Sequence, residues 1–233
     1  MKQAIPLLLF FLVVVTQTAF PQLRKEIFCI GPMGGGASTW LMNKNVNNLP
    51  EGEQELELTF GSSVGISITS YFSQNVGIGL DILYSTHNQK YNGVVDTVSK
   101  IPYTSKTHIG MVDLPLYLRL STNYGAFFEI GSVFSFVTSA KYSMETEFPH
   151  LSGNKNLKSS VSGFNIAPML GLGVDIDLND RLILSPGLRF SYGVTDIKGV
   201  DGKGASVSDY SSYEKTHTMA GGLQLALVYR IEN

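Results

Sequence analysis

The stretch FNIAPMLGLGVDIDL, residues 164–178, alternates between two kinds of side chain, and this alternation decides the fold. Large apolar residues take the even positions from Phe164 to Leu178, and small or polar residues take most of the odd positions. A period of two is the pattern of a β-strand with one apolar face. The run is longer than the ~5–6 residues of a common globular strand. It therefore predicts a long strand whose two faces meet different surroundings.

The same alternation recurs along the chain and predicts an all-β fold with about eight strands. It is clear in residues 56–69, 76–85, 182–194 and 219–231, weaker in 109–121 and 125–142, and weakest in 28–42. Short connections are expected at 73–75, 122–124 and 179–180, and long polar ones at 43–55, 86–106, 143–160 and 196–215. Short and long connections alternate, so both termini fall on the short-turn side. This is the plan of an antiparallel, up-and-down transmembrane β-barrel, with short periplasmic turns and long extracellular loops.

The composition excludes several other classes of protein. The chain has 233 residues, of which 43% are hydrophobic and 15% charged, with a formal net charge of -2. Soluble domains carry roughly 25% charged residues. The balanced charge argues against a nucleic-acid partner. The single cysteine, Cys29, excludes a disulfide scaffold.

Alternation alone does not say whether the apolar face points inward or outward. A soluble barrel of the lipocalin type would show water its polar face, which should then be rich in Lys and Glu. Here that face is mostly Gly, Ser, Ala and Thr. Small residues fit the crowded interior of a narrow barrel, and an uncharged apolar face fits lipid, where Arg or Lys at mid-depth costs ~2–4 kcal/mol. We therefore expect the apolar face to contact lipid.

Aromatic residues near the strand ends are candidates for the two interfacial girdles of such a barrel. One girdle would lie at the short turns and the other near the long loops. The first set is Tyr71, Phe72, Tyr124, Phe127, Phe128 and Tyr229, and the second is Trp40, Tyr84, Tyr142 and Tyr192.

Three prolines, Pro115, Pro168 and Pro186, fall inside predicted strands. Proline cannot donate to the ladder, and a closed barrel has no free edge to place it on. We therefore expect a local bulge at each of them.

Residues 1–22 have the features of a cleavable signal peptide. Lys2 supplies a positive start, residues 7–15 form an apolar run, and small residues end at Ala19. The apolar run is shorter than the ~20 residues of a spanning helix. We expect cleavage between Ala19 and Gln22, which leaves a barrel domain at 23–233.

The segment VDLPLYLR, residues 112–119, resembles the proline-containing strand of the PorT-like outer-membrane β-barrel family, through Leu114, Pro115, Leu116 and the basic Arg119. Residues 124–131, 170–175 and 188–194 resemble other strands of that family. The resemblance implies an eight-stranded barrel in the outer membrane of Gram-negative bacteria, with both termini periplasmic. The family's namesake assists the type IX secretion machinery, so an accessory role in protein secretion, with envelope or secretion-machinery partners, is implied as well.

Seven charged residues share the parity of the lumen side. They form the predicted lumen charge network: Asp81, Asp113, Arg119, Glu129, Asp175, Arg189 and Arg230. An uncompensated buried charge is costly, so each should be paired or solvated. Arg119 and Glu129 flank one short turn and should form an ion pair. We interpret the set as a plug of paired side chains rather than an ion path, because eight strands leave no aqueous channel.

Other functions remain open, with less support from the sequence. We expect the four histidines to lie in or beside long loops, where a metal site is conceivable but no ligand spacing indicates one: His87, His108, His150 and His217. A lipid-modifying enzyme could combine His217 or His108 with Ser85 or Ser206. A small-solute pore is the third alternative. The preferred interpretation is a non-enzymatic barrel without a cofactor that contacts outer-membrane lipid and a partner.

Overall fold

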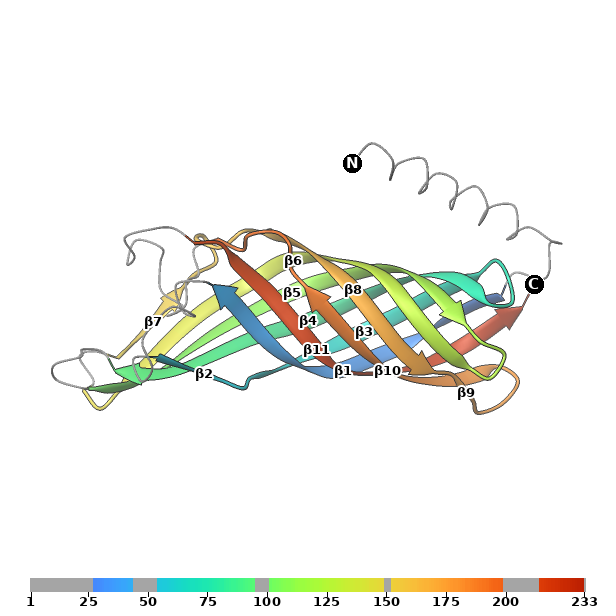
Figure 1. Cartoon of the computed structure of the whole chain (residues 1–233), viewed down its shortest axis with the longest axis horizontal. Coiled ribbons are helices and arrows are strands. Elements are labelled where there is room, and N and C mark those ends of the chain that lie inside the picture. Colours follow the sequence, from blue (N-terminus) through green and yellow to red (C-terminus); the bar gives the residue numbers. More distant parts are fainter. Residues whose placement is uncertain (1–26, 44–53, 95–100, 149–151, 199–213, 233) are drawn as a thin grey trace, which may run out of the picture.

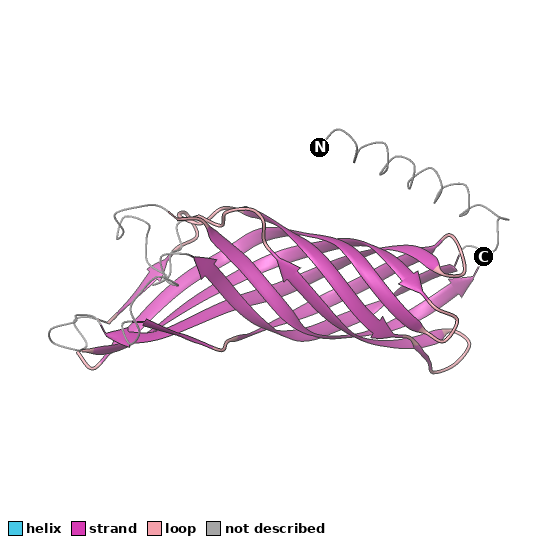
Figure 2. Ribbon diagram, viewed as in Figure 1, coloured by secondary structure: helices cyan, strands magenta, loops and turns pink. Residues whose placement is uncertain are grey.

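The computed structural model describes residues 27–43, 54–94, 101–148, 152–198 and 214–232, and these form one closed antiparallel barrel (Figure 1). Eight strands make the ring: β1 (Ile27–Asn43), β3 (Phe60–Tyr71), β4 (Val76–Val94), β5 (Pro102–Ser121), β6 (Ala126–Thr146), β8 (Phe164–Val174), β10 (Leu182–Tyr192) and β11 (Thr216–Glu232). The last strand, β11, pairs with both β10 and β1, which closes the ring. The described residues are drawn as strands and loops in Figure 2, and the predicted all-β barrel is confirmed.

Three short strands extend or interrupt the ring. They are β2 (Gln54–Glu57), which pairs with β4, β7 (Gly153–Asn156), which pairs with β6, and β9 (Ile176–Asp177), which pairs with β10. No helix in the described part of the chain is long and apolar enough to cross a membrane.

The short connections lie together at one end of the barrel. They are residues 72–75, 122–125 and 178–181, close to the predicted turns. The start of β1 pairs with the end of β11 at this same end, through Ile27 and Glu232. The first and last strands therefore meet on the short-turn side, as the order of connections predicts.

The two faces of the strands divide as the alternation predicts. Most large apolar residues on the outward parity are exposed, such as Leu80 in β4, Leu118 in β5 and Leu172 in β8. Inward positions are buried, and many of them are small, polar or charged, such as Ser67 in β3 and Glu129 in β6. The core of the molecule is therefore the filled lumen, and the apolar surface is on the outside.

One bulge reverses the parity of β6 near its outer end. The register between β5 and β6 shifts between Gly110 and Met111, and Thr138 has no partner in the ladder. Beyond this point Tyr142 packs against buried apolar side chains of the lumen instead of facing lipid. The predicted girdle position of Tyr142 is therefore wrong, since the alternation was counted through a bulge. Two predicted positions in the girdle at the short turns are also wrong: Phe127 is buried in the lumen, 8% exposed, and Tyr71 packs against buried side chains of the lumen.

Strands β4, β5 and β6 continue well past the barrel wall on the long-loop side. They have 19, 20 and 21 residues, whereas about 9–11 cross a bilayer. The β4–β5 ladder runs without a break in register to Val94 and Pro102. The predicted loop at 86–106 is therefore mostly a hairpin, and β6 and β7 occupy part of the predicted loop at 143–160. Figure 1 shows this extended sheet, with β2 and β7 at its edges, projecting from the end opposite the turns.

The prolines sit at gaps in the ladders rather than at bulges. Pro115 pairs with β6, but the β4–β5 ladder skips it and resumes in the same register. Pro168 lies one residue beyond the last pair between β8 and β10. Pro186 lies in β10 between the residues that pair with β8 and those that pair with β9. The expected bulges are therefore wrong: a missing donor is accommodated by leaving one ladder unpaired locally. The predicted signal peptide, residues 1–22, lies outside the described residues.

Candidate functional site in the barrel lumen

A chain of ion pairs crosses the half of the lumen nearest the short turns. Arg119 binds Glu129 at 3.1 Å and Asp175 at 2.5 Å, and Arg189 binds Glu129 at 2.7 Å and Asp81 at 2.5 Å. We call the five residues Asp81, Arg189, Glu129, Arg119 and Asp175 the charge chain. Its members come from β4, β10, β6, β5 and the residue that separates β8 from β9. One chain of contacts thus ties five parts of the wall together.

The local sequence explains the position of Arg119 but not that of Arg189. Arg119 and Glu129 are direct partners in the β5–β6 ladder, on either side of a short turn, so the expected ion pair is present. Arg189 instead reaches across the lumen, because β10 and β4 lie on opposite sides of the ring. Both carboxylates that it contacts are almost completely buried, with side chains 0% and 2% exposed.

Aromatic rings and hydroxyl groups complete the surroundings of the charge chain. The guanidinium of Arg119 lies 3.5 Å from the centre of the Phe127 ring, and that of Arg189 lies 4.6 Å from the centre of the Tyr117 ring. The Tyr117 hydroxyl donates to Asp81 Oδ1 at 3.1 Å, and the Ser185 hydroxyl donates to Asp175 Oδ1 at 2.5 Å. Cation–π contact and charge-assisted hydrogen bonds both favour buried charge.

Two residues of the predicted network lie outside this chain. Asp113 sits nearer the long-loop end, where its Oδ2 accepts from Ser85 at 2.5 Å and its Oδ1 has no hydrogen-bond partner in the described structure. Arg230 pairs with Asp177 at 2.7 Å at the rim beside the short turns, where the Asp177 side chain is 63% exposed. Arg230 is therefore a rim residue, because its strand has already reached the end of the barrel there.

A small cavity lies above the charge chain, at the level of Asp113. It has a volume of about 90 Å³ and is lined by Ser85, His87, Asp113, Asn165 and Thr218, among others. A buried water needs about one probe sphere of roughly 10–15 Å³ and two to four polar partners. The cavity therefore has room for a few water molecules.

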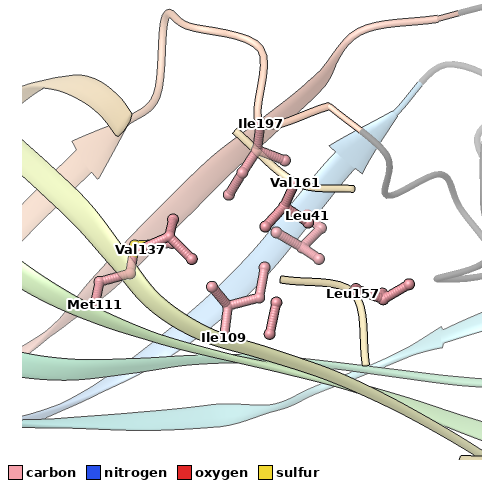
Figure 3. Packing of buried hydrophobic residues seen from close by; sticks show 8 residues of the cluster. Leu41, Ile109, Met111, Val137, Leu157, Val161 and Ile197 are labelled. Atoms are coloured by element: carbon pink, nitrogen blue, oxygen red, sulfur yellow. The ribbon is translucent and has the colours of Figure 1, made fainter. Parts of the chain in front are cut away.

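Apolar side chains close the lumen at the long-loop end. We call this cluster the outer plug: Leu41, Ile109, Met111, Val137, Ala140, Leu157, Val161 and Ile197. Figure 3 shows residues from β1, β5 and β6 meeting three that come from the connections, Leu157, Val161 and Ile197. All three are at most 8% exposed.

Backbone hydrogen bonds hold those connections in the mouth of the barrel. Leu157 N–H donates to the Ala140 carbonyl at 2.9 Å, and Ser162 N–H donates to the Ile197 carbonyl at 2.5 Å. The connections are thus bonded to the wall and to one another, and the plug is part of the fold.

The residues considered for an enzymatic site are not brought together. Ser85 faces the lumen, whereas His108, on the outward parity of β5, has its Nδ1 2.6 Å from Asn88 Oδ1. His217 lies on the outward parity of β11, with its Nδ1 3.0 Å from the Gly193 carbonyl oxygen. Ser206 lies outside the described residues. The wall of the barrel therefore separates Ser85 from both histidines.

The histidines are also dispersed as metal ligands. His87 and His108 lie in strands rather than in loops, since the β4–β5 hairpin is longer than expected, and His150 lies outside the described residues. Among the residues that the structure describes, no group of three or more His, Cys, Asp or Glu could hold a metal ion.

Sequence reasoning missed the uncharged members of the lumen site. Tyr117, Ser185 and Asn165 each hydrogen-bond within the lumen. Tyr117 has the same parity as Arg119, two residues away in β5, so parity alone could have included it. A prediction confined to charged residues leaves out Tyr117 and Ser185, whose hydroxyl groups hydrogen-bond to those charges.

Comparison with known proteins gives the family. The sequence matches the outer membrane protein beta-barrel domain over residues 21–199. No curated protein matches it. Similar solved structures include AlkL in lipid bilayers (11% identity, covering 92% of this chain and 94% of that one, TM-score 0.43) and OprG from Pseudomonas aeruginosa (10% identity, 92% and 99%, TM-score 0.40). The outer membrane protease OmpT from Escherichia coli is also similar (8% identity, 91% and 98%, TM-score 0.38).

The family match covers most of the chain, and the closed antiparallel ring agrees with it. The apolar outer face and the short turns at one end are the features of barrels in this membrane. The chain therefore belongs to the outer membrane protein beta-barrel domain family, located in the outer membrane of Gram-negative cells.

Proposed function

We propose that this protein is a non-enzymatic, plugged barrel that acts as a structural and interaction protein of the outer membrane. The observation that carries the proposal is the filled lumen. The charge chain occupies the half near the short turns, and the outer plug closes the other end. A solute pore needs a continuous aqueous path, and eight strands enclose a space that side chains fill.

The parts available to a partner are then the surfaces at the two ends. The extended sheet of β4, β5 and β6 projects from the long-loop end, which is the extracellular end in barrels of this kind. The turns 72–75, 122–125 and 178–181 face the periplasm. An accessory role in protein secretion of the PorT type is the finer hypothesis, and it rests on the resemblance of residues 112–119 to that family.

A deletion strain tests the proposal and separates its alternatives. We expect unchanged lipid A composition by mass spectrometry, because the Ser and His candidates do not meet, and unchanged uptake of small solutes. A modified lipid A profile would favour a lipid-modifying enzyme, and reduced uptake would favour a pore. Both results would contradict the proposal.

The secretion hypothesis needs its own measurement in the same strain. We expect the deletion to reduce the amount of type IX cargo in the culture medium, and the wild-type gene supplied in trans to restore it. Cargo secretion that equals the parent strain would remove the secretion role while leaving the plugged barrel intact.

A further inference from the structure

The outward face of the extended sheet continues the lipid-facing surface of the barrel, and it carries a groove lined by basic residues. Tyr84, Val112 and Phe136 form one cross-strand row on the outward parity of β4, β5 and β6. Tyr84 and Phe136 are 48% and 46% exposed, and Phe136 lies 5.2 Å from the ring of Phe164. Such a row of exposed aromatic side chains is typical of the membrane interface.

Cationic side chains follow on the same face, farther along the same strands. His108 is directly opposite Lys141 across the β5–β6 ladder, and Lys90 is directly opposite Lys106 across the β4–β5 ladder. These four residues, together with Lys155, Leu58 and Phe60, line an open groove of about 900 Å³, which we call the basic groove.

Little negative charge compensates the basic groove. Lys90 is ion-paired with Glu57, whereas Lys106 and Lys141 are exposed and make no ion pair within the described residues. Like charges directly opposite each other on a sheet are destabilising. Glu57 already compensates Lys90, so Lys106 and Lys141 are the positive charges left for an anion to bind.

The groove is also partly apolar, which restricts the kind of anion. Leu58 and Phe60 are 63% and 67% exposed beside the lysines, and the Asn88 side chain donates to the Phe60 carbonyl at 2.6 Å. Exposed apolar and cationic side chains in one groove match a ligand that carries both hydrocarbon and phosphate.

The height of the groove above the membrane agrees with a headgroup. His108 lies four residues beyond Val112 on β5, or about 13 Å along a strand that rises ~3.3 Å per residue, and Lys141 is its partner on β6. With the usual strand tilt this is about 10 Å above the interface. Flexible lysine side chains can reach down from there to the polar layer.

We propose that the basic groove binds the phosphate of a phosphorylated glycolipid in the outer leaflet of the membrane. Lys106 and Lys141 bind the phosphate oxygens, His108 and Asn88 add polar contacts, and Leu58 and Phe60 contact the apolar parts of the headgroup. The long-loop end faces that leaflet, so the headgroup extends from the membrane toward the groove. The site thus attaches the extended sheet to the lipid beside it.

Lipid retention by purified protein tests this proposal. The full-length protein is reconstituted in phosphatidylcholine vesicles that contain either phosphorylated or dephosphorylated lipid A, then extracted in mild detergent, and bound lipid is counted by native mass spectrometry. We expect retention of phosphorylated lipid A alone. Each lysine near a charged membrane surface contributes about five-fold, so the double variant Lys106→Gln/Lys141→Gln should weaken binding about 30-fold.

Matched variants separate the site from general charge. Lys198→Gln removes an exposed lysine of the β10–β11 connection and should leave retention unchanged. Lys106→Arg keeps the positive charge at this position, so the variant protein should retain phosphorylated lipid A. This variant tests the role of charge in the groove even if the double variant fails to fold. Equal retention of dephosphorylated lipid A, equal loss in Lys198→Gln, or binding of inorganic phosphate as strong as that of lipid A would each overturn the proposal.

Discussion

The charge chain predicts a large loss of stability when Arg189 is replaced by methionine. The side chain of Arg189 is 9% exposed and is the ion-pair partner of Asp81, whose side chain is 0% exposed. Its removal leaves Asp81 with the Tyr117 hydroxyl, while Glu129 keeps Arg119. Breaking a buried pair from one side costs about 3–5 kcal/mol, because the remaining charge stays buried without compensation. We expect this loss in the free energy of unfolding.

Arg230→Met is the matched control for this experiment. Its ion pair with Asp177 is of similar length, 2.7 Å, but the two side chains are 25% and 63% exposed. Exposed pairs contribute about 0–1 kcal/mol. The same substitution should therefore have a small effect at the rim and a large effect in the lumen.

A second substitution tests whether the unpaired carboxylate causes the loss. Asp81→Asn removes the charge with little change in shape and can keep the Tyr117 contact. Added to Arg189→Met, it should restore about 2 kcal/mol, within the range of coupling between contacting residues. The double variant would then be more stable than Arg189→Met alone.

Urea titration in phosphatidylcholine vesicles measures these differences. Unfolding can be followed by the fluorescence of Trp40, the single tryptophan, and by loss of the folded band on gels of unboiled samples. The free energy is obtained by linear extrapolation. Stability of Arg189→Met within 1 kcal/mol of Arg230→Met, by either probe, would refute the account of the charge chain.

Three further predictions use the same titration or simple labelling. The free energy of unfolding of Gly125→Ala should fall by about 1–3 kcal/mol, because Gly125 has φ +86° and an added Cβ would lie 2.5 Å from a backbone oxygen. Gly36→Ala is the control, since an added Cβ there would have no atom within 4 Å. The free energy of unfolding of Gly79→Ala should also fall by about 1–3 kcal/mol, since the added Cβ would lie 2.3 Å from the Tyr117 ring. An unchanged urea midpoint in Gly125→Ala or in Gly79→Ala would contradict the packing described. Cys29 is 4% exposed and should react with maleimide only after unfolding, so rapid labelling of the folded protein would contradict its burial.

The barrel itself could be predicted because lipid and lumen impose opposite demands on alternate residues. That contrast is strong in residues 164–178, and it weakens where the outward face of a strand meets water instead of lipid. In the described parts of 86–106 the outward residues project beyond the aromatic row and buried inward residues such as Gln89 and Ser105 are polar, so the hydrophobic alternation fades although the ladder continues to Val94. The prediction therefore ended the strands of this hairpin too early.

The lumen site could be predicted only where neighbouring strands set the register. The Arg119–Glu129 pair follows from a short turn, whose length fixes which residues face each other. The contact of Arg189 with Asp81 spans the ring and depends on barrel radius and tilt, which alternation does not contain. The inward position of Tyr142 depends on the bulge opposite Gly110, for which the sequence offered no recognised signal.

The central claim is that the lumen is closed by its own side chains. Recording ion current through planar lipid bilayers that contain the purified, refolded protein tests this claim most directly. With the charge chain across one half and the outer plug across the other, we predict a baseline equal to that of protein-free bilayers. Reproducible ohmic conductance steps that appear with each inserted barrel would contradict the account.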